Sequence, residues 1–159
     1  MISISFYQFI ASEHPLPDLL SPKLHYPDGR DRSSFESPDD LEDLEIIQEM
    51  IGYLFVDISV YTKKKLIYRL NMTYTPERGQ RLYDYLKAQC QPDSRYELWT
   101  IDMNADTQEA IHNQLVHLHR TYCTKDVLSL ELLARECDHQ TFTEDDYPRV
   151  LIIQPEAAE

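Results

Sequence analysis

Short stretches in which every second side chain is apolar are the feature that most constrains how this chain folds. Residues 2–10, 54–61, 66–74 and 96–103 all show this alternation and are rich in β-branched or aromatic residues. A period of two is typical of a strand whose two faces meet different surroundings. The uninterrupted apolar run at 150–153 is typical of a strand buried on both faces. The chain therefore predicts a sheet.

The intervening segments show the spacing and the start signals of helices. A serine–proline pair followed by acidic residues predicts a helix over about 38–51, because such residues cap the first turn and favour the positive end of the helix dipole. A threonine–proline pair predicts a second helix starting at Pro76. Apolar residues recurring at helical spacing predict a third helix within 104–122 and a fourth at about 125–137.

The expected order of elements is β-α-β-β-α-β, followed by α-α-β. The first six match the split β-α-β pattern of ferredoxin-like folds. We therefore expect an α+β protein with a ferredoxin-like core and a C-terminal α-α-β extension, in a single domain spanning 1–159. The length of 159 residues and a hydrophobic fraction of 42% fit one globular domain. This fold supports many unrelated activities, so function has to be argued from the side chains.

Residues 11–37 form a long proline-rich arm, and residues 155–159 are expected to be a frayed tail. The arm holds four prolines, which disfavour helix and remove backbone donors. It also holds several leucines and aromatic residues, which a flexible linker does not need. We expect these apolar residues to dock the arm onto the domain or onto a partner.

The N-terminal sequence and the cysteines favour a cytoplasmic location. No apolar stretch approaches the roughly 20 residues that a membrane-spanning helix needs. The first residues lack the basic segment of a signal peptide. Three widely spaced cysteines, Cys90, Cys123 and Cys137, form no disulfide framework and fit a reducing compartment.

The net charge of −13 is unevenly distributed along the chain. Residues 1–62 and 96–159 each carry −9, whereas residues 63–95 carry +5. A negative surface repels nucleic acids and anionic membranes and attracts basic proteins. We therefore expect a basic protein partner, and neither nucleic acid nor membrane. The alternative is that the acidity only keeps the protein soluble.

The candidate partner-binding surface is the outer face of the first expected helix, which would be strongly acidic. Its residues are Glu36, Asp39, Asp40, Glu42, Asp43, Glu45 and Glu49.

A second candidate is the sheet face that carries aromatic and polar side chains. Aromatic sheet faces of this kind stack on RNA bases, but this chain lacks the positive field that nucleic-acid binding needs. The alternative is that these side chains pair with one another or lie beneath the C-terminal helices. The residues are Tyr53, Phe55, Asp57, Tyr61 and Arg69.

The basic middle of the chain is a third candidate. It could contact anions, or it could meet an acidic face of a second copy and form a homodimer. The alternative is a solvated hairpin tip and helix face. Its residues are Lys63, Lys64, Lys65, Arg69, Arg78, Arg81, Lys87 and Arg95.

No catalytic, metal or cofactor signature is found. On a helix, His112 and His119 would share a side, but they make one pair and not a site of three or four ligands. The cysteines lack the flanking residues of known nucleophiles. Three glycines leave little scope for a phosphate-binding loop. We therefore expect no catalytic residues, no metal and no cofactor.

These observations favour a non-catalytic, acidic protein-binding module. An immunity or antitoxin protein that neutralises a basic toxin is one form of it. The first alternative is a small enzyme or small-molecule-binding domain with its site between the sheet and the C-terminal helices, near His112, His119, Asp57 and Tyr53. The second alternative is a homo-oligomeric regulatory subunit.

Overall fold

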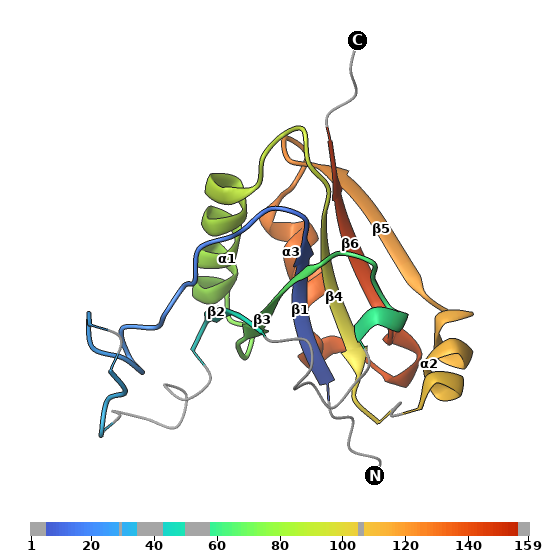
Figure 1. Ribbon diagram of the computed structural model, residues 1–159, viewed down its shortest axis with the longest axis horizontal. Coiled ribbons are helices and arrows are strands. Elements are labelled where there is room, and N and C mark those ends of the chain that lie inside the picture. The colour runs from blue at the N-terminus through green and yellow to red at the C-terminus, as the bar shows by residue number, and fades with distance from the viewer. Residues whose placement is uncertain (1–5, 29, 35–42, 50–57, 105–106, 156–159) are drawn as a thin grey trace.

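The computed structural model describes residues 6–28, 30–34, 43–49, 58–104 and 107–155 (Figure 1). Within these ranges the fold is mixed α+β, as the sequence predicts, with one six-stranded sheet and three α-helices. Three short 3₁₀ turns complete the elements, at Ile58–Val60, His139–Thr141 and Glu144–Asp146. The strands and helices are β1 (Phe6–Ser12), β2 (Glu45–Gln48), β3 (Leu66–Asn71), α1 (Pro76–Gln89), β4 (Tyr96–Asp102), α2 (Gln108–Leu115), β5 (His119–Thr124), α3 (Leu130–Cys137) and β6 (Arg149–Gln154).

The strands lie in the order β2-β3-β1-β4-β6-β5, so β2 and β5 form the two edges of the sheet. Neighbouring strands are antiparallel except β5 and β6, which are parallel. Figure 1 shows β5 as the outermost strand on the right, beyond β6. The central strands thus come from the beginning, middle and end of the described chain.

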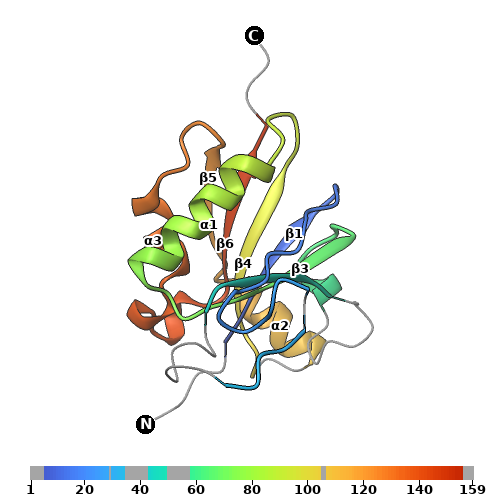
Figure 2. The same ribbon diagram turned by 90° about the vertical axis from the view of Figure 1, so that its left-hand side faces the viewer.

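Each face of the sheet is covered by its own helices, because the side chains alternate between two cores. On one face, Leu98 of β4 and Leu151 of β6 pack with buried leucines of α1 and α3. On the other face, Trp99 and Val150 pack with Ile111 of α2 and with the 3₁₀ turn at 58–60. The turned view in Figure 2 shows α1 and α3 together and α2 apart from them.

All three α-helices begin at a threonine or serine whose side chain accepts a backbone hydrogen bond. The predicted start of α1 is confirmed, since the Thr75 hydroxyl accepts from the amide of Arg78 at 3.2 Å. The third expected helix starts at Thr107, and the fourth at Ser129, by the same capping logic. None of the described helices is both long and apolar enough to cross a membrane.

The predicted helix over 38–51 is wrong at residues 45–48, which form the edge strand β2. Ile46 pairs with Leu70 of β3, and both Leu44 and Ile46 are fully buried. Apolar residues in this short run fit helical spacing as well as alternation, and pairing with β3 selects the strand. Residues 38–42 and 50–51 lie outside the described residues. The ferredoxin-like order of elements is not confirmed, because β2 stands where its first helix would be.

Two further predictions need correction. The expected strand over 54–61 is a 3₁₀ turn at 58–60, while residues 54–57 lie outside the described ranges. The third helix ends at Leu115 and not at Tyr122, because residues 119–124 form β5. Hydrogen bonding along β6 stabilises the strand in that segment.

The proline-rich arm lies along the β2 edge of the sheet. Leu19 and Ile46 exchange two backbone hydrogen bonds, of 2.8 and 2.9 Å. The amide of Leu16 donates to the hydroxyl of Tyr68 at 2.8 Å, and the hydroxyl of Tyr85 on α1 donates to the carbonyl of Pro17 at 2.7 Å. The arm is therefore tied to the sheet and to α1 by backbone and side-chain contacts.

Candidate functional site

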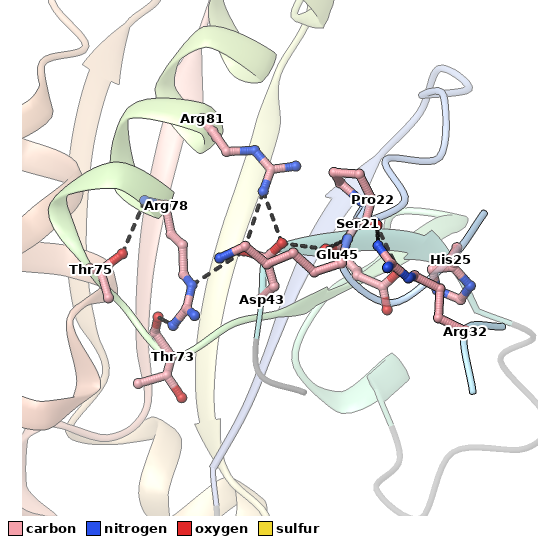
Figure 3. A network of polar contacts seen from close by, with 11 residues as sticks. Ser21, Pro22, His25, Arg32, Asp43, Glu45, Thr73, Thr75, Arg78 and Arg81 are labelled. Atoms are coloured by element: carbon pink, nitrogen blue, oxygen red, sulfur yellow. Dashed lines mark hydrogen bonds and ion pairs between the residues drawn. The ribbon is translucent and has the colours of Figure 1, made fainter. Parts of the chain in front are cut away.

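Asp43, a member of the expected acidic surface, is buried in a polar network between the arm and α1 (Figure 3). Its carboxylate lies 3.4 Å from Nε of Arg78 and 3.2 Å from Nη1 of Arg81, and it accepts a short hydrogen bond from the hydroxyl of Ser21. Burial by itself opposes ionisation, but the hydrogen bonds from Ser21 and the Leu44 backbone and the charge of Arg81 lower the pKa of Asp43. Asp43 therefore acts as an internal anion.

Glu45, from the same expected surface, also faces the arm. It is 5% exposed, and it accepts a hydrogen bond from the amide of Ser21 at 3.2 Å. Its Oε2 atom lies 2.6 Å from Nε2 of His25, whose Nδ1 lies 3.0 Å from Asp31. This corrects the expected acidic helix, because Asp43 and Glu45 hold the arm to the β2 edge and are not presented to solvent.

Some of the other candidates of the acidic and aromatic surfaces lie outside the described residues, and the rest make contacts within the molecule. Glu36, Asp39, Asp40 and Glu42, like Tyr53, Phe55 and Asp57, lie outside the described residues. Glu49 pairs with Arg69 at 3.4 Å. Tyr61 is 8% exposed and packs against Trp99 beneath the sheet, with ring centroids 5.6 Å apart. Tyr61 therefore belongs to a core, and Arg69 to an ion pair.

Several residues of the basic middle of the chain make contacts within the molecule. Arg78 and Arg81 share Asp43, and Lys64 pairs with Glu13 at 2.9 Å. The Nζ atom of Lys87 donates to the carbonyl of Lys125. These contacts occupy Arg78, Arg81 and Lys64, whereas Lys63 and Lys65 are exposed.

The histidines and cysteines are not assembled for chemistry in the described part of the chain. His112 lies on α2 and His119 on β5, so the two do not share a helix side. No group of three potential metal-ligating side chains occurs among the described residues. Burial raises the pKa of the Cys90 thiol to about 12 and raises that of Cys123 and Cys137 as well, which disfavours the nucleophilic thiolate.

The open edge of the sheet is the most distinctive surface of the molecule. The amide of His119 donates to the carbonyl of Pro148 at 3.2 Å, next to β6. Because successive residues of a strand direct their backbone groups to opposite sides, those of Arg120 and Tyr122 point away from β6. Within the described residues, no strand pairs with this side of β5. Such a row of backbone donors and acceptors is a template for an added strand.

Exposed apolar side chains occur on β5 and in the segments next to it in the sequence. Six large apolar residues are exposed among the described ones, and four of them fall within 116–130. We call β5 with these flanks the β5 edge surface. It is defined by Val116 (79% exposed), Tyr122 (53%), Val127 (67%) and Leu130 (40%), together with Arg120.

The β5 edge surface differs in charge from the protein as a whole. Its charged residues between 116 and 130 are Arg120, Lys125 and Asp126, so it carries one net positive charge in a protein of −13. It contains no proline, and a single arginine is its only strand-interior charge. Natural sheets usually protect an open edge with proline, charged side chains or a covering element, and here Arg120 is the only charged residue inside the strand. An edge with so little protection among the described residues can accept a further strand.

A polar cleft of about 780 Å³ lies beside the first residue of β5. The Asp102 carboxylate in it accepts from the Asn104 amide at 2.9 Å and from Nε2 of Gln114 at 3.3 Å. Burial, with added repulsion from Asp102, raises the pKa of Tyr147. The His119 ring lies 2.6 Å from the carbonyl of Asp145. The remaining lining residues are Asn113, Val116, His117 and Leu118.

Sequence reasoning missed the β5 edge surface because Tyr122 continued the helical spacing of the third expected helix. A local signal was present, since Thr121, Tyr122 and Thr124 belong to residue types that favour strands. Comparisons of this chain with protein-family models, with curated proteins and with solved structures find no match.

Proposed function

We propose that this protein is a non-catalytic protein-binding module that takes up an extended segment of its partner along the open edge of β5. The observation that carries the proposal is the coincidence of an unpaired strand edge with most of the exposed large apolar side chains of the described chain. Strand addition supplies affinity through main-chain hydrogen bonds, and neighbouring side chains supply specificity. Tyrosine is a favoured interface residue, and Tyr122 lies at the centre of this surface.

The net charge supports a basic partner, which it would attract at long range. We place this interaction in the cytoplasm. A protein of −13 raises the local concentration of basic proteins and their rate of encounter. An immunity- or antitoxin-type protein that covers a basic toxin is the setting that this charge favours. The burial of Asp43 and Glu45 removes two of the seven expected acidic contacts, which supports a contact surface at β5.

A pair of substitutions at one position tests the role of the edge. Tyr122→Pro removes the ring and the outward-pointing amide, whereas Tyr122→Ala removes the ring alone. Neither changes a hydrogen bond to β6, because the Tyr122 amide points away from that strand. The amount of partner that cross-links to the protein in its native cells should be lower for Tyr122→Ala than for the wild type. With Tyr122→Pro the cross-linked partner should be lost. Equal recovery by all three proteins contradicts the proposal.

A second candidate function is small-molecule binding in the cleft at Asp102, and the cleft volume of about 780 Å³ favours it. Ligand pockets commonly have volumes of about 300–1,000 Å³. A metabolite panel screened by thermal shift should then raise the Tm of the wild-type protein more than that of an Asp102→Asn variant. Equal shifts in both proteins place binding elsewhere.

A further inference from the structure

We infer that the segment added to β5 is β5 of a second copy, in an antiparallel arrangement with its two-fold axis at Thr121. The inference rests on the strand addition of the proposed function, and it names a second copy, in place of a basic protein, as the occupant of the same surface. Most homo-oligomers are two-fold dimers in which one surface patch meets itself. Here the sheets of the two copies would become continuous across the paired β5 strands.

The backbone of β5 is self-complementary in this register. Because Arg120 and Tyr122 both direct their backbone groups outward, Arg120 of one copy stands opposite Tyr122 of the other. Each such pair exchanges two hydrogen bonds, and the two-fold axis generates a second pair. Thr121 then faces Thr121 of the second copy in a closely spaced position without hydrogen bonds.

The side chains agree with this register. Arg120 and Tyr122 lie on the same sheet face, opposite to Cys123, which is buried in the core beneath α1 and α3. Antiparallel pairing places each guanidinium beside the tyrosine ring of the other copy and not beside the other guanidinium. Arginine–aromatic and cross-strand pairs of this kind are stabilising. This cross-strand pairing of arginine with tyrosine thus favours the two-fold arrangement.

The apolar flanks match under the same symmetry. Val116 precedes β5 and Val127 follows it, and both are more than half exposed. An antiparallel partner brings the beginning of one β5 strand beside the end of the other. The two-fold axis therefore brings the segment before β5, which holds Val116, towards the turn after β5 of the other copy, which holds Asp126 and Val127. This covers apolar surface at both ends of the interface.

The opposite edge of the sheet limits the assembly to two copies. A molecule with two open edges would continue into a fibre, because each added copy would offer a new edge. In this molecule the arm occupies the β2 edge through the two hydrogen bonds between Leu19 and Ile46. Among the described strands only β5 then remains to pair, so the assembly closes as a dimer.

Net charge gives the dimer a characteristic salt dependence. Two copies of −13 repel each other at long range, and salt screens that repulsion. Dimerisation should therefore strengthen between 50 mM and 500 mM salt, whereas binding to a basic protein should weaken over the same range. The sign of the salt effect separates the two kinds of partner.

Sedimentation velocity over a concentration series tests the dimer directly. The sedimenting mass of the wild-type chain should rise from 18.8 kDa to twice that value as the protein concentration increases. In high salt this change should occur at a lower concentration. Tyr122→Pro should remain a monomer at every concentration, and Tyr122→Ala should dimerise at least tenfold more weakly. Circular dichroism and Tm confirm that each variant folds. A wild-type chain that stays monomeric at millimolar concentration and high salt overturns the inference.

A cysteine pair tests the register independently of proline. Thr121→Cys should form a disulfide-linked dimer on mild oxidation, because facing residues at a closely spaced antiparallel position meet disulfide geometry. Arg120→Cys is the matched control, since it is more exposed but displaced from the axis. The wild type, whose Cys123 is buried, should remain unlinked. Cross-linking that is faster at Arg120→Cys than at Thr121→Cys rules out this register.

The outcomes separate this inference from the proposed function. A monomeric chain whose native partner is lost with Tyr122→Pro overturns the second copy as occupant and leaves strand addition at β5 intact. A dimer that survives Tyr122→Pro and does not cross-link through Thr121→Cys uses another surface and contradicts the second copy at β5. Native partners that are also unaffected by Tyr122→Pro contradict the proposed function itself.

Discussion

One edge of the sheet, at β2, is covered by the arm, and the other edge, at β5, is open in the described part of the chain. At β2, Leu19 of the arm forms a backbone bridge with Ile46. The buried Asp43 pairs with Arg78 of α1, and the buried Glu45 contacts His25 of the arm. At β5, the backbone groups of Arg120 and Tyr122 have no strand partner within the described residues, and apolar side chains stand exposed around them. The chain thus covers its β2 edge with its own arm and, in the ranges described, leaves the β5 edge uncovered. We therefore interpret the open edge as a contact surface.

The largest expected effect comes from removing the anion of the covered edge. Asp43→Ala removes the carboxylate that pairs with the buried guanidinium of Arg78 and the partly exposed guanidinium of Arg81. Breaking one side of a buried pair should lower the free energy of unfolding by about 3 kcal/mol. Urea denaturation measures this. The matched control is Asp28→Ala, whose pair with Arg30 is exposed and should matter by less than about 1 kcal/mol. Equal effects would mean that Asp43 does not secure the arm.

A proline in the covered edge should have the next largest effect. Leu19→Pro removes the hydrogen bond from the Leu19 amide to Ile46 and leaves a buried acceptor unsatisfied. We expect a loss of about 1–3 kcal/mol in the free energy of unfolding. Tyr122→Pro is the contrasting variant and should cost less, about 1 kcal/mol or below, because its amide makes no hydrogen bond to β6 and proline is tolerated in edge strands. A similar loss from both prolines would remove the difference between the edges.

Acidification should weaken the covered edge selectively. The pKa of Asp43 is lowered in the folded protein from its ordinary value of 3.8, because hydrogen bonds from Ser21 and the Leu44 backbone and the Arg81 charge outweigh the effect of burial. A group with a lowered folded pKa stabilises the protein above its unfolded pKa, and that stability is lost as pH falls through the folded value. Between pH 5 and pH 3 the urea midpoint of unfolding should therefore decrease less for Asp43→Asn than for the wild type. The same decrease in both proteins would show that another group dominates.

The smallest effect is on exchange rates and leaves stability unchanged. In dilute wild-type protein, the amide of Ile46, which donates to Leu19, should exchange at least about tenfold more slowly than the amides of Arg120 and Tyr122. Hydrogen–deuterium exchange with residue resolution measures this, and high protein concentration should slow the two β5 amides only. Slow exchange at β5 in the dilute monomer would indicate that the edge is already covered.

Local signals allowed part of this fold to be predicted. The start of α1 follows from adjacent residues, since the Thr75 cap and Pro76 act within one turn. Strand β3 follows from clear alternation over 66–71. In both cases the deciding interactions lie inside the segment or depend only on which face is buried.

The two sheet edges could not be predicted in the same way, because distant residues decide them. Ile46 becomes a strand residue by pairing with Leu70 and Leu19, and Tyr122 by lying next to Ile152. Asp43 resembles a surface acid until Arg78, 35 positions later, is placed beside it. Spacing within a short window contains none of this information, so the candidate site moved from the acidic segment to β5.

The position of β6 has a consequence for the order in which the protein can be assembled during its synthesis. Strand β6 lies between β4 and β5, although it follows both along the chain. Until residues 149–154 have left the ribosome, β5 has no strand on either side, while β1, β3 and β4 can already pair. The nascent chain therefore passes through a stage in which its future contact strand is unpaired on both sides, when premature association with a neighbouring nascent chain is easiest.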